Sequence, residues 1–255
     1  MRDGKTLDEV LDEVVAEETA VALVYNGISH AVMMATPCDL EDFARGFSLT
    51  ERIVEKPSEI YDIEVESVGR GIEVKLEIAT QRLAALQERR RSLAGRTGCG
   101  LCGVDSLDAA LRPVAASQGV GQASRQAIAL AMAALPKAQR INKENGATHA
   151  AGWATADGTL VAVREDVGRH NALDKLAGAL AKNGGASSGG FVVVTSRCSY
   201  EMVQKAAAID AVAIAAVSAP TSLAIETAEQ AGIALVAFVR EGRLTVYAHP
   251  ERITA

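Results

Sequence analysis

The sequence predicts an α/β protein in which a smaller α+β N-terminal domain precedes a C-terminal three-layer α/β sandwich. In the second half, short β-rich runs alternate with helical stretches, and in the first half β-rich runs pair around turn signals. The 255 residues are 49% hydrophobic, which is enough to bury a sizeable core. We therefore expect an N-terminal domain over residues 1–95, a connector over 96–123 and an α/β domain over 124–255.

The first half opens with an acidic stretch, residues 7–17, that favours a helix. Residues 20–25 and 29–35 are β-rich and flank Asn26-Gly27, a strong signal for a type I′ hairpin. Thr36-Pro37 then indicates the approach to a helix. The other elements expected in this half are a helix over 40–53, strands over 60–68 and 72–78, and a helix over 81–93 that ends at Gly95.

From residue 148 onward, strands alternate with helices of about ten residues, which implies βαβ units and three layers. The run from Phe191 to Thr195 is apolar, as is typical of a fully buried strand. A short helix is expected near residues 105–108 and a longer one over 124–135. The later elements are strands over 148–155 and 160–164 joined at Asp157-Gly158, a helix over 171–180, a strand over 191–195, a helix over 200–209, a strand over 212–217, a helix over 222–231, and strands over 233–239 and 244–248.

Composition excludes several classes of protein. With 26 Lys and Arg against 32 Asp and Glu, the chain lacks the broad basic face of a nucleic-acid-binding protein. We find neither the apolar core of a signal peptide nor an apolar stretch of about 20 residues, so we expect a soluble, cytoplasmic protein without membrane contact. Four cysteines are too few for a disulfide scaffold, so a close pair points to catalysis or metal binding.

Cys99-Gly-Leu-Cys102 forms such a pair, flanked by glycines. A structural zinc site usually needs two such pairs, and no second pair exists in the sequence. A thioredoxin-like motif follows a strand, whereas this motif follows a charged helical stretch. The remaining interpretation is a reactive thiol, because cationic neighbours lower the pKa of a thiol. The alternative is that the arginines before the motif only form the solvated face of a helix. These arginines are Arg89, Arg90, Arg91 and Arg96.

A second polar run, Arg164 to Asn171, closes a strand and opens a helix, where open α/β sheets commonly bind ligands. Arg164 and Arg169 can hold a phosphate, with helix-start N–H groups completing an anion site. An internal salt-bridge network, with Asp166 or Asn171 as a cap, explains the same run equally well.

Three further arginines lie at comparable positions. Arg197 follows the next strand and should emerge on the same sheet edge as Arg164 and Arg169, while Arg240 and Arg243 flank a hairpin turn at Gly242. The alternatives are ordinary: Ser196 and Ser199 suit helix caps, and Cys198 suits a small buried residue. His30 and His149 have no evident partner in the sequence.

These motifs together resemble the formate dehydrogenase accessory sulfurtransferase family (FdhD). The resemblance extends over almost the whole chain from about residue 20. It is carried by the following segments: Ala35-Thr-Pro, Phe43-Ala-Arg-Gly-Phe-Ser-Leu-Thr-Glu51, Cys99-Gly-Leu-Cys102-Gly, Arg164-Glu-Asp-Val-Gly-Arg-His-Asn-Ala-Leu-Asp-Lys175, Ser196-Arg197 and Tyr247-Ala-His-Pro250. The chain departs from the family at Thr97-Gly98, where serines often stand.

The resemblance implies a sulfurtransferase that acts as a sulfur carrier. A cysteine desulfurase would load a persulfide sulfur on Cys99, with Cys102 assisting. The sulfur would pass to the bis(molybdopterin guanine dinucleotide) molybdenum cofactor that formate dehydrogenase needs. The resemblance also implies a cytidine-deaminase-like C-terminal fold and a homodimer. The family's cofactor-binding stretch matches Phe238, Val239, Arg240, Glu241, Gly242 and Arg243.

The polar loops fit this cofactor, because the guanine dinucleotide arms are anionic and local positive charge can attract them despite a net charge of −6. The expected contacts are Arg164, Arg169, His170, Arg197, Arg240 and Arg243. A zinc deaminase is a second interpretation, but its H-x-E and P-C-x-x-C signatures are missing, since Ala172 and Gly98 stand in two of the required places; no tightly bound zinc is expected. A third interpretation is a non-catalytic chaperone that only binds the cofactor.

Overall fold

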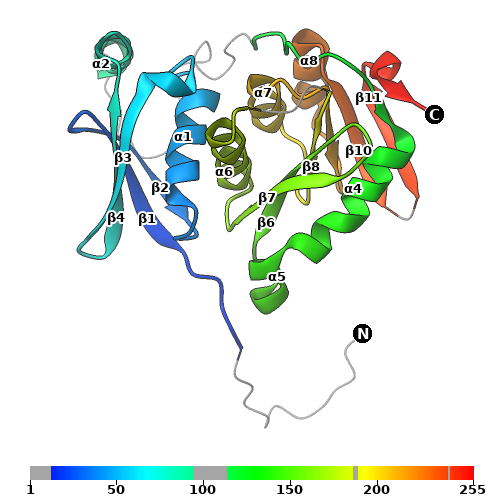
Figure 1. Cartoon of the computed structure of the whole chain (residues 1–255), viewed down its shortest axis with the longest axis horizontal. Coiled ribbons are helices and arrows are strands. Elements are labelled where there is room, and N and C mark those ends of the chain that lie inside the picture. The colour runs from blue at the N-terminus through cyan, green and yellow to red at the C-terminus, as the bar shows by residue number, and fades with distance from the viewer. Residues whose placement is uncertain (1–12, 95–113, 186–188, 241) are drawn as a thin grey trace.

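The computed structural model describes residues 13–94, 114–185, 189–240 and 242–255, which form two lobes that lie side by side (Figure 1). The N-terminal lobe is a four-stranded sheet with two helices, and the C-terminal lobe is a six-stranded sheet with helices on both faces. Cys99, Cys102, Glu241 and the short helix expected near residues 105–108 lie outside the described residues.

From residue 19 onward, the N-terminal lobe contains the elements that the sequence predicts. Its strands pair in the order β2-β1-β4-β3, and the β1–β2 hairpin turns at Asn26 (φ 46°) and Gly27 (φ 80°), as a type I′ turn requires. The elements are β1 (Thr19–Tyr25), β2 (Ile28–Ala35), α1 (Leu40–Thr50), a 3₁₀ turn (Pro57–Glu59), β3 (Ile60–Val68), β4 (Gly71–Ile78) and α2 (Thr80–Ala94).

The helix expected over residues 7–17 is wrong for residues 13–17, which have no regular structure, and the rest of it lies outside the described residues. Val14 and Val15 are 62% and 82% exposed, so this segment buries no apolar face against the lobe. Without such packing an isolated short helix is unstable in water, which explains the error.

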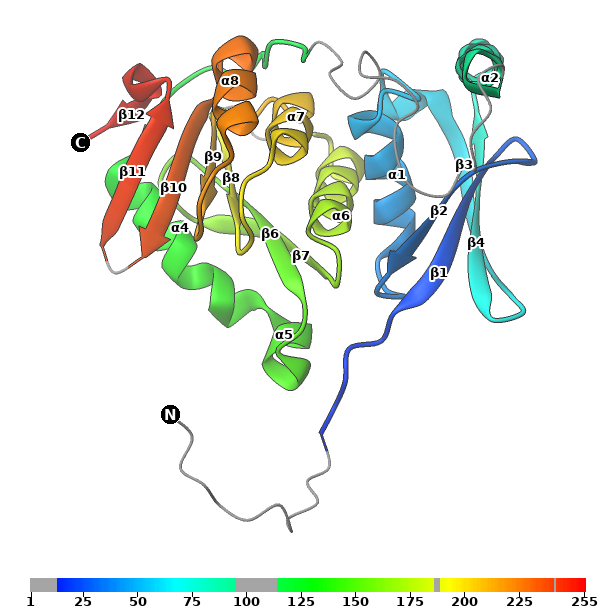
Figure 2. The same cartoon turned by 180° about the vertical axis from the view of Figure 1, so that it is seen from behind.

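The C-terminal lobe is a three-layer α/β sandwich, which confirms the predicted fold class. The strand order is β11-β10-β9-β8-β6-β7, with β8, β9 and β10 parallel. α4 covers one face, and α6, α7 and α8 cover the other (Figure 2). The elements are β5 (Ala123–Ser124), α4 (Arg125–Ala138), α5 (Arg140–Asn145), β6 (His149–Ala154), β7 (Leu160–Asp166), α6 (Arg169–Lys182), β8 (Phe191–Val194), α7 (Tyr200–Ala208), β9 (Ala213–Ala216), α8 (Ser222–Ala231), β10 (Ala234–Arg240), β11 (Arg243–Ala248), a 3₁₀ turn (Pro250–Arg252) and β12 (Ile253–Thr254).

Strand alternation divides the core between the two faces of this sheet. Val192 and Val194 pack with α6, α7 and α8, whereas Phe191 and Val193 pack with α4. All four side chains are fully buried, as expected for a strand covered on both faces. None of the helices in the described part of the chain combines the length and hydropathy that a bilayer crossing requires.

The lobes meet where α1 crosses α6, and two glycines allow the helices to approach closely. A Cβ atom on Gly46 would lie 1.7 Å from the carbonyl oxygen of Asp174, and one on Gly178 would lie 1.8 Å from that of Asp42. Any side chain at either position would therefore force the helices apart.

Buried ion pairs reinforce the same interface. The Lys205 ammonium lies 2.9 Å from Asp174 and 2.8 Å from Glu51. Burial opposes the charged form of Lys205, but the two carboxylates outweigh it and raise the pKa of the lysine. The contact thus joins α7, α6 and the end of α1, which fixes α6 relative to the N-terminal lobe.

Candidate functional site

The polar loops singled out in the sequence lie along one edge of the C-terminal sheet. Because β8, β9 and β10 are parallel, their carboxyl ends share this edge. β6 is antiparallel to β7 and β8, so it starts at this edge while β7 ends there; His149 pairs with Asp166 in the ladder. Arg197, on the loop after β8, therefore emerges on the same sheet edge as the Arg169 turn after β7, as the sequence predicts.

Backbone hydrogen bonds tie neighbouring loops of this edge together. The Cys198 amide donates to Ala219 O at 3.2 Å, and the Thr221 amide donates to Cys198 O at 3.1 Å. The Phe238 amide donates to Ser218 O at 3.3 Å. These bonds join the loops after β8 and β9 to each other and to Phe238 near the end of β10, so the three segments form one continuous rim.

Two helices begin at this edge without a side-chain cap. α4 and α8 are capped by their own residues, since Ser124 Oγ accepts from Ala127 N and Thr221 Oγ1 accepts from Ala224 N. The residue at the cap position before α6 is Gly168, which has no side chain, and the one before α7 is Ser199, whose side chain makes no capping bond. The first N–H groups of a helix attract anions when no cap satisfies them. Ser199 stands at the cap position of α7, as the sequence predicts, but its hydroxyl accepts no bond from the first N–H groups of the helix.

Unsatisfied donors and positive charge gather around these helix starts. Arg169 Nε and Ser199 Oγ are buried and have no hydrogen-bond partner among the described residues. Partial burial, together with the positive charge of Arg169 and His170, lowers the pKa of His149. Buried donors without partners are rare in native proteins and indicate that a ligand or water satisfies them.

Glu201, at the start of α7, is the acidic member of this group. His170 Nε2 lies 2.8 Å from Glu201 Oε2 and lowers the pKa of that carboxyl, with smaller contributions from Lys205 and Arg169. This contact joins the α6 start to the α7 start. We call Arg169, His170, His149, Ser199 and Arg197 the anion edge.

Arg164 does not belong to the anion edge. Its guanidinium lies 2.7 Å and 3.0 Å from Asp42 Oδ2, through NH2 and Nε, so it pairs with the N-terminal lobe. The run from Arg164 to Asn171 had two interpretations, an internal salt bridge and an anion site. Arg164 forms an internal salt bridge, whereas Arg169 Nε has no partner among the described residues and is available to an anion. The Arg164 charge is already paired with Asp42, so we leave Arg164 out of the anion edge, and the phosphate contact expected for it stays a prediction.

The hairpin between β10 and β11 adds an aromatic ring to the rim. Phe238 has φ 53°, a conformation that costs a bulky residue about 1–3 kcal/mol and that clusters at functional sites. The Arg240 guanidinium lies 5.9 Å from the Phe238 ring, and Arg243 pairs with Arg240 in the ladder. Val239 is 3% exposed and packs in the core beneath α4, so its side chain faces away from solvent.

The two cysteines that the structure describes are unsuited to nucleophilic chemistry. Burial raises the pKa of the Cys198 thiol to about 12. Partial burial also raises the pKa of Cys38, which the nearby Lys175 ammonium only partly offsets. Since the thiolate is the nucleophile, neither side chain is activated near neutral pH. Within the described ranges, no group of three or more His, Cys, Asp or Glu side chains is arranged to hold a metal.

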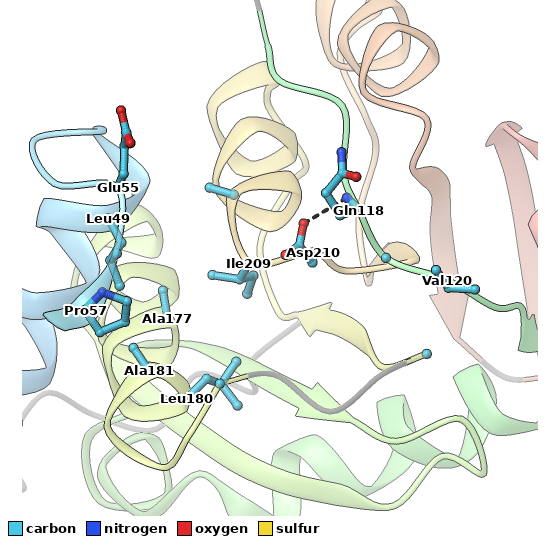
Figure 3. A pocket seen from close by; sticks show the side chains of 14 residues that line it. Leu49, Glu55, Pro57, Gln118, Val120, Ala177, Leu180, Ala181, Ile209 and Asp210 are labelled. Atoms are coloured by element: carbon cyan, nitrogen blue, oxygen red, sulfur yellow. Dashed lines mark hydrogen bonds between the residues drawn. The ribbon is translucent and has the colours of Figure 1, made fainter.

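The structure also has a cavity of about 440 Å³ that contains none of the predicted site residues. Figure 3 shows Leu49 and Pro57 of the N-terminal lobe opposite Ala177, Leu180 and Ala181 of α6. These α6 residues lie toward the carboxyl end of the helix, whereas Arg169 and His170 begin it. The cavity and the anion edge are thus separate features at opposite ends of α6.

Two residues of this edge could not be assigned to the site from the sequence. His149 starts a strand and Glu201 falls in the first turn of a helix, and both residue types are common in such places. Their positions in the sequence are the only indication of a shared site, because His149 starts one strand, Glu201 follows another, and both lie at the same edge of the sheet. Only the strand order, with β6 between β7 and β8, brings them together.

Comparison with known proteins gives consistent results over nearly the full length. The chain is 59% identical over 239 residues to a protein of Cupriavidus necator named sulfur carrier protein FdhD, covering 94% of this chain and 83% of that one. A protein of the same name from Bordetella petrii is 53% identical, with coverage of 94% and 86%. The crystal structure of a putative formate dehydrogenase accessory protein from Desulfotalea psychrophila superposes with a TM-score of 0.73 at 27% identity, covering 96% of this chain and 92% of that one. The FdhD/NarQ family profile matches residues 16–254, and the chain therefore belongs to the FdhD/NarQ family.

Proposed function

We propose that this protein is a sulfur carrier with sulfurtransferase activity that serves formate dehydrogenase. It accepts persulfide sulfur from a cysteine desulfurase and delivers it to the bis(molybdopterin guanine dinucleotide) molybdenum cofactor. Relatives more than 50% identical are named as sulfur carriers, and a structural relative is described as a formate dehydrogenase accessory protein, which supports the assignment. The protein acts as the homodimer that the family resemblance implies.

Cys99 carries the sulfur in this proposal. Its thiolate attacks the terminal sulfur of the desulfurase persulfide, so a Cys99 persulfide forms and the desulfurase thiolate leaves. In delivery, the Cys102 thiolate attacks the Cys99 sulfur, a Cys99–Cys102 disulfide forms, and the terminal sulfur leaves as hydrosulfide for the molybdenum. The cysteine pair thus supplies the two electrons that convert sulfane sulfur to sulfide.

The observation that carries the cofactor half of the proposal is the anion edge. Two helix starts without side-chain caps and the unpartnered Arg169 Nε lie on one sheet edge with the exposed Arg197. Diphosphate groups fit this donor set, because each offers several anionic oxygens to N–H groups and guanidinium. The acidic net charge does not oppose this encounter, since the local charge at the edge is positive.

The β10–β11 hairpin supplies a surface for a purine ring. The Phe238 ring and the neighbouring Arg240 guanidinium offer flat faces on which a guanine can stack. Arg240 and Arg243 are exposed and add positive charge at the same place. In our proposal Arg169, His170 and Arg197 hold the diphosphate and the hairpin holds the base.

Sulfur loading tests the carrier half directly. Incubation with a cysteine desulfurase and L-cysteine should add about 32 Da to the chain, which is one sulfur atom, and a reductant should remove it. Intact-mass spectrometry with peptide mapping measures the addition and places it on Cys99. A chain whose mass does not change under conditions that load a known acceptor would contradict the assignment.

Nucleotide binding tests the cofactor half. We expect Arg169→Gln to weaken GDP binding about tenfold, because a charge-assisted hydrogen bond contributes about 1.5–3 kcal/mol. Arg82→Gln is the matched control, since Arg82 pairs with Glu55 and Glu59 in the N-terminal lobe and lies away from the edge. Isothermal titration calorimetry measures both. Equal GDP affinity in the two variants would remove Arg169 from the site.

A further inference from the structure

The turn that carries Arg169 and His170 is shaped by a residue of the other lobe. Thr36 lies just after β2, is 5% exposed, and meets residues 166–167 from across the interface. Its amide donates to Asp166 Oδ2 at 3.0 Å, and its hydroxyl accepts from the Val167 amide at 3.1 Å. Its carbonyl accepts from Lys175 Nζ at 2.9 Å. The amide, hydroxyl and carbonyl of Thr36 are therefore all bonded to residues of the C-terminal lobe, and the first two hold the turn just before α6.

Asp166 is the second element of this arrangement. Its carboxylate is fully buried and receives four donors, two on each oxygen. Oδ1 accepts from the Gly168 amide at 2.8 Å and Asn171 Nδ2 at 3.1 Å. Oδ2 lies 2.7 Å from Lys175 Nζ, in addition to its bond from Thr36. A carboxylate offers about four acceptor positions, so none is left for the amides of Arg169 and His170.

The first amides of the turn and of α6 differ in whether the protein itself satisfies them. The Val167 and Gly168 amides are satisfied internally by Thr36 and Asp166. The amides of Arg169 and His170, which follow in the first turn of α6, have no side-chain cap. The bonds of Thr36 thus fix the turn that precedes these amides, and the first N–H groups of a helix point out of its N-terminal end, where an anion can bind.

We propose that Thr36 is a positioning residue, through which the N-terminal lobe preorganises the α6 anion site for phosphate groups of the cofactor. This inference rests on the proposed function, because it assumes that a nucleotide diphosphate binds at the α6 start. Thr36 does not touch the ligand. It acts through Val167 and Asp166.

Two threonine variants test the proposal, and a third controls it. Thr36→Val replaces the hydroxyl with a methyl group and leaves the Val167 amide unsatisfied, whereas Thr36→Ser keeps the hydroxyl. Thr50→Val is the control, since Thr50 also belongs to the N-terminal lobe and donates to an α6 carboxylate, Asp174, at 2.6 Å, but away from the helix start. We expect Thr36→Val to raise the Kd for GDP about fivefold, and Thr36→Ser and Thr50→Val to stay within about twofold of the wild type.

Thermal unfolding of the same variants separates positioning from general stability. If Thr36→Val and Thr50→Val lower Tm to a similar extent and only Thr36→Val weakens GDP binding, the positioning role is supported. If both weaken it equally, or if neither does, the proposal is overturned. If the wild type itself fails to bind GDP while Cys99 still loads sulfur, it is the proposed cofactor site that has failed.

A measurement on the unmodified protein keeps the test open should Thr36→Val not fold. In amide NMR spectra, GDP should shift the Arg169 and His170 resonances, while the Val167 amide stays protected from hydrogen exchange with and without GDP. Rapid exchange of the Val167 amide in the GDP complex would show that the Thr36 bond is absent when ligand binds, and would contradict the proposal.

Discussion

Replacing Cys99 by alanine should abolish sulfur loading completely, while the folded protein and its nucleotide affinity remain. The thiolate of Cys99 is the acceptor in the proposed transfer, and Cys102 acts only in the delivery step. The described thiols, Cys38 and Cys198, both have raised pKa values and are poor nucleophiles near neutral pH. Intact-mass measurement after incubation with a desulfurase and L-cysteine, in parallel with the wild type, gives the result.

Cys38→Ala is the matched control and should load sulfur as well as the wild type. Full loading of Cys99→Ala would show that another cysteine is the carrier. Complementation of a strain that lacks the gene separates the carrier from a chaperone that only binds the cofactor. A carrier requires Cys99 for formate dehydrogenase activity, whereas a chaperone with Cys99→Ala would still support maturation.

Gly46→Ala should destabilise the protein by about 3 kcal/mol, and Gly178→Ala should do the same. At both positions the added Cβ would overlap a backbone carbonyl oxygen of the facing helix, at 1.7 Å and 1.8 Å. Backbone atoms in a packed helix cannot move aside as a flexible side chain can, so α1 and α6 must separate. Urea unfolding measures the change in free energy.

Gly184→Ala provides the comparison for this effect. Gly184 has φ 92°, and no atom lies within 4 Å of the place that an alanine methyl group would occupy, so alanine there incurs only a backbone cost of about 1 kcal/mol. Similar losses at Gly46 and Gly184 would mean that the crossing of α1 and α6 relaxes easily. Weaker GDP binding in Gly46→Ala would further indicate that the lobe interface supports the α6 start.

Strong local patterns allowed most elements to be predicted. The Asn26-Gly27 turn, the buried strand from Phe191 and the helix over 222–231 all have signals contained within a few residues, and the structure confirms them. The two-residue strands β5 and β12 and the helix α5 were not predicted. Ala123 pairs with Ile253 across the whole lobe, and a pairing of such short strands leaves no pattern in either segment.

Some residues of the candidate site could likewise be predicted from local sequence, whereas others could not. The sequence placed Arg169, His170 and Arg197 after neighbouring strands, which was sufficient to expect them on one edge. It gave no means of separating Arg164 from Arg169, because both are arginines in one polar run. The partner of Arg164 is Asp42, which is 122 residues away in the chain. Only the packing of α1 against α6 identifies that pair.

What the sequence determined by itself is the chemistry of this protein: the fold class, the family and the cysteine pair that the proposed carrier needs all follow from residues close together in the chain. The tertiary structure alone decided which polar residues face solvent. It paired Arg164 and Lys175 internally, left the α6 start without a cap, and brought Thr36 to the turn before it. The physical reason is that a buried charge must find its partner in space, whichever part of the chain supplies it.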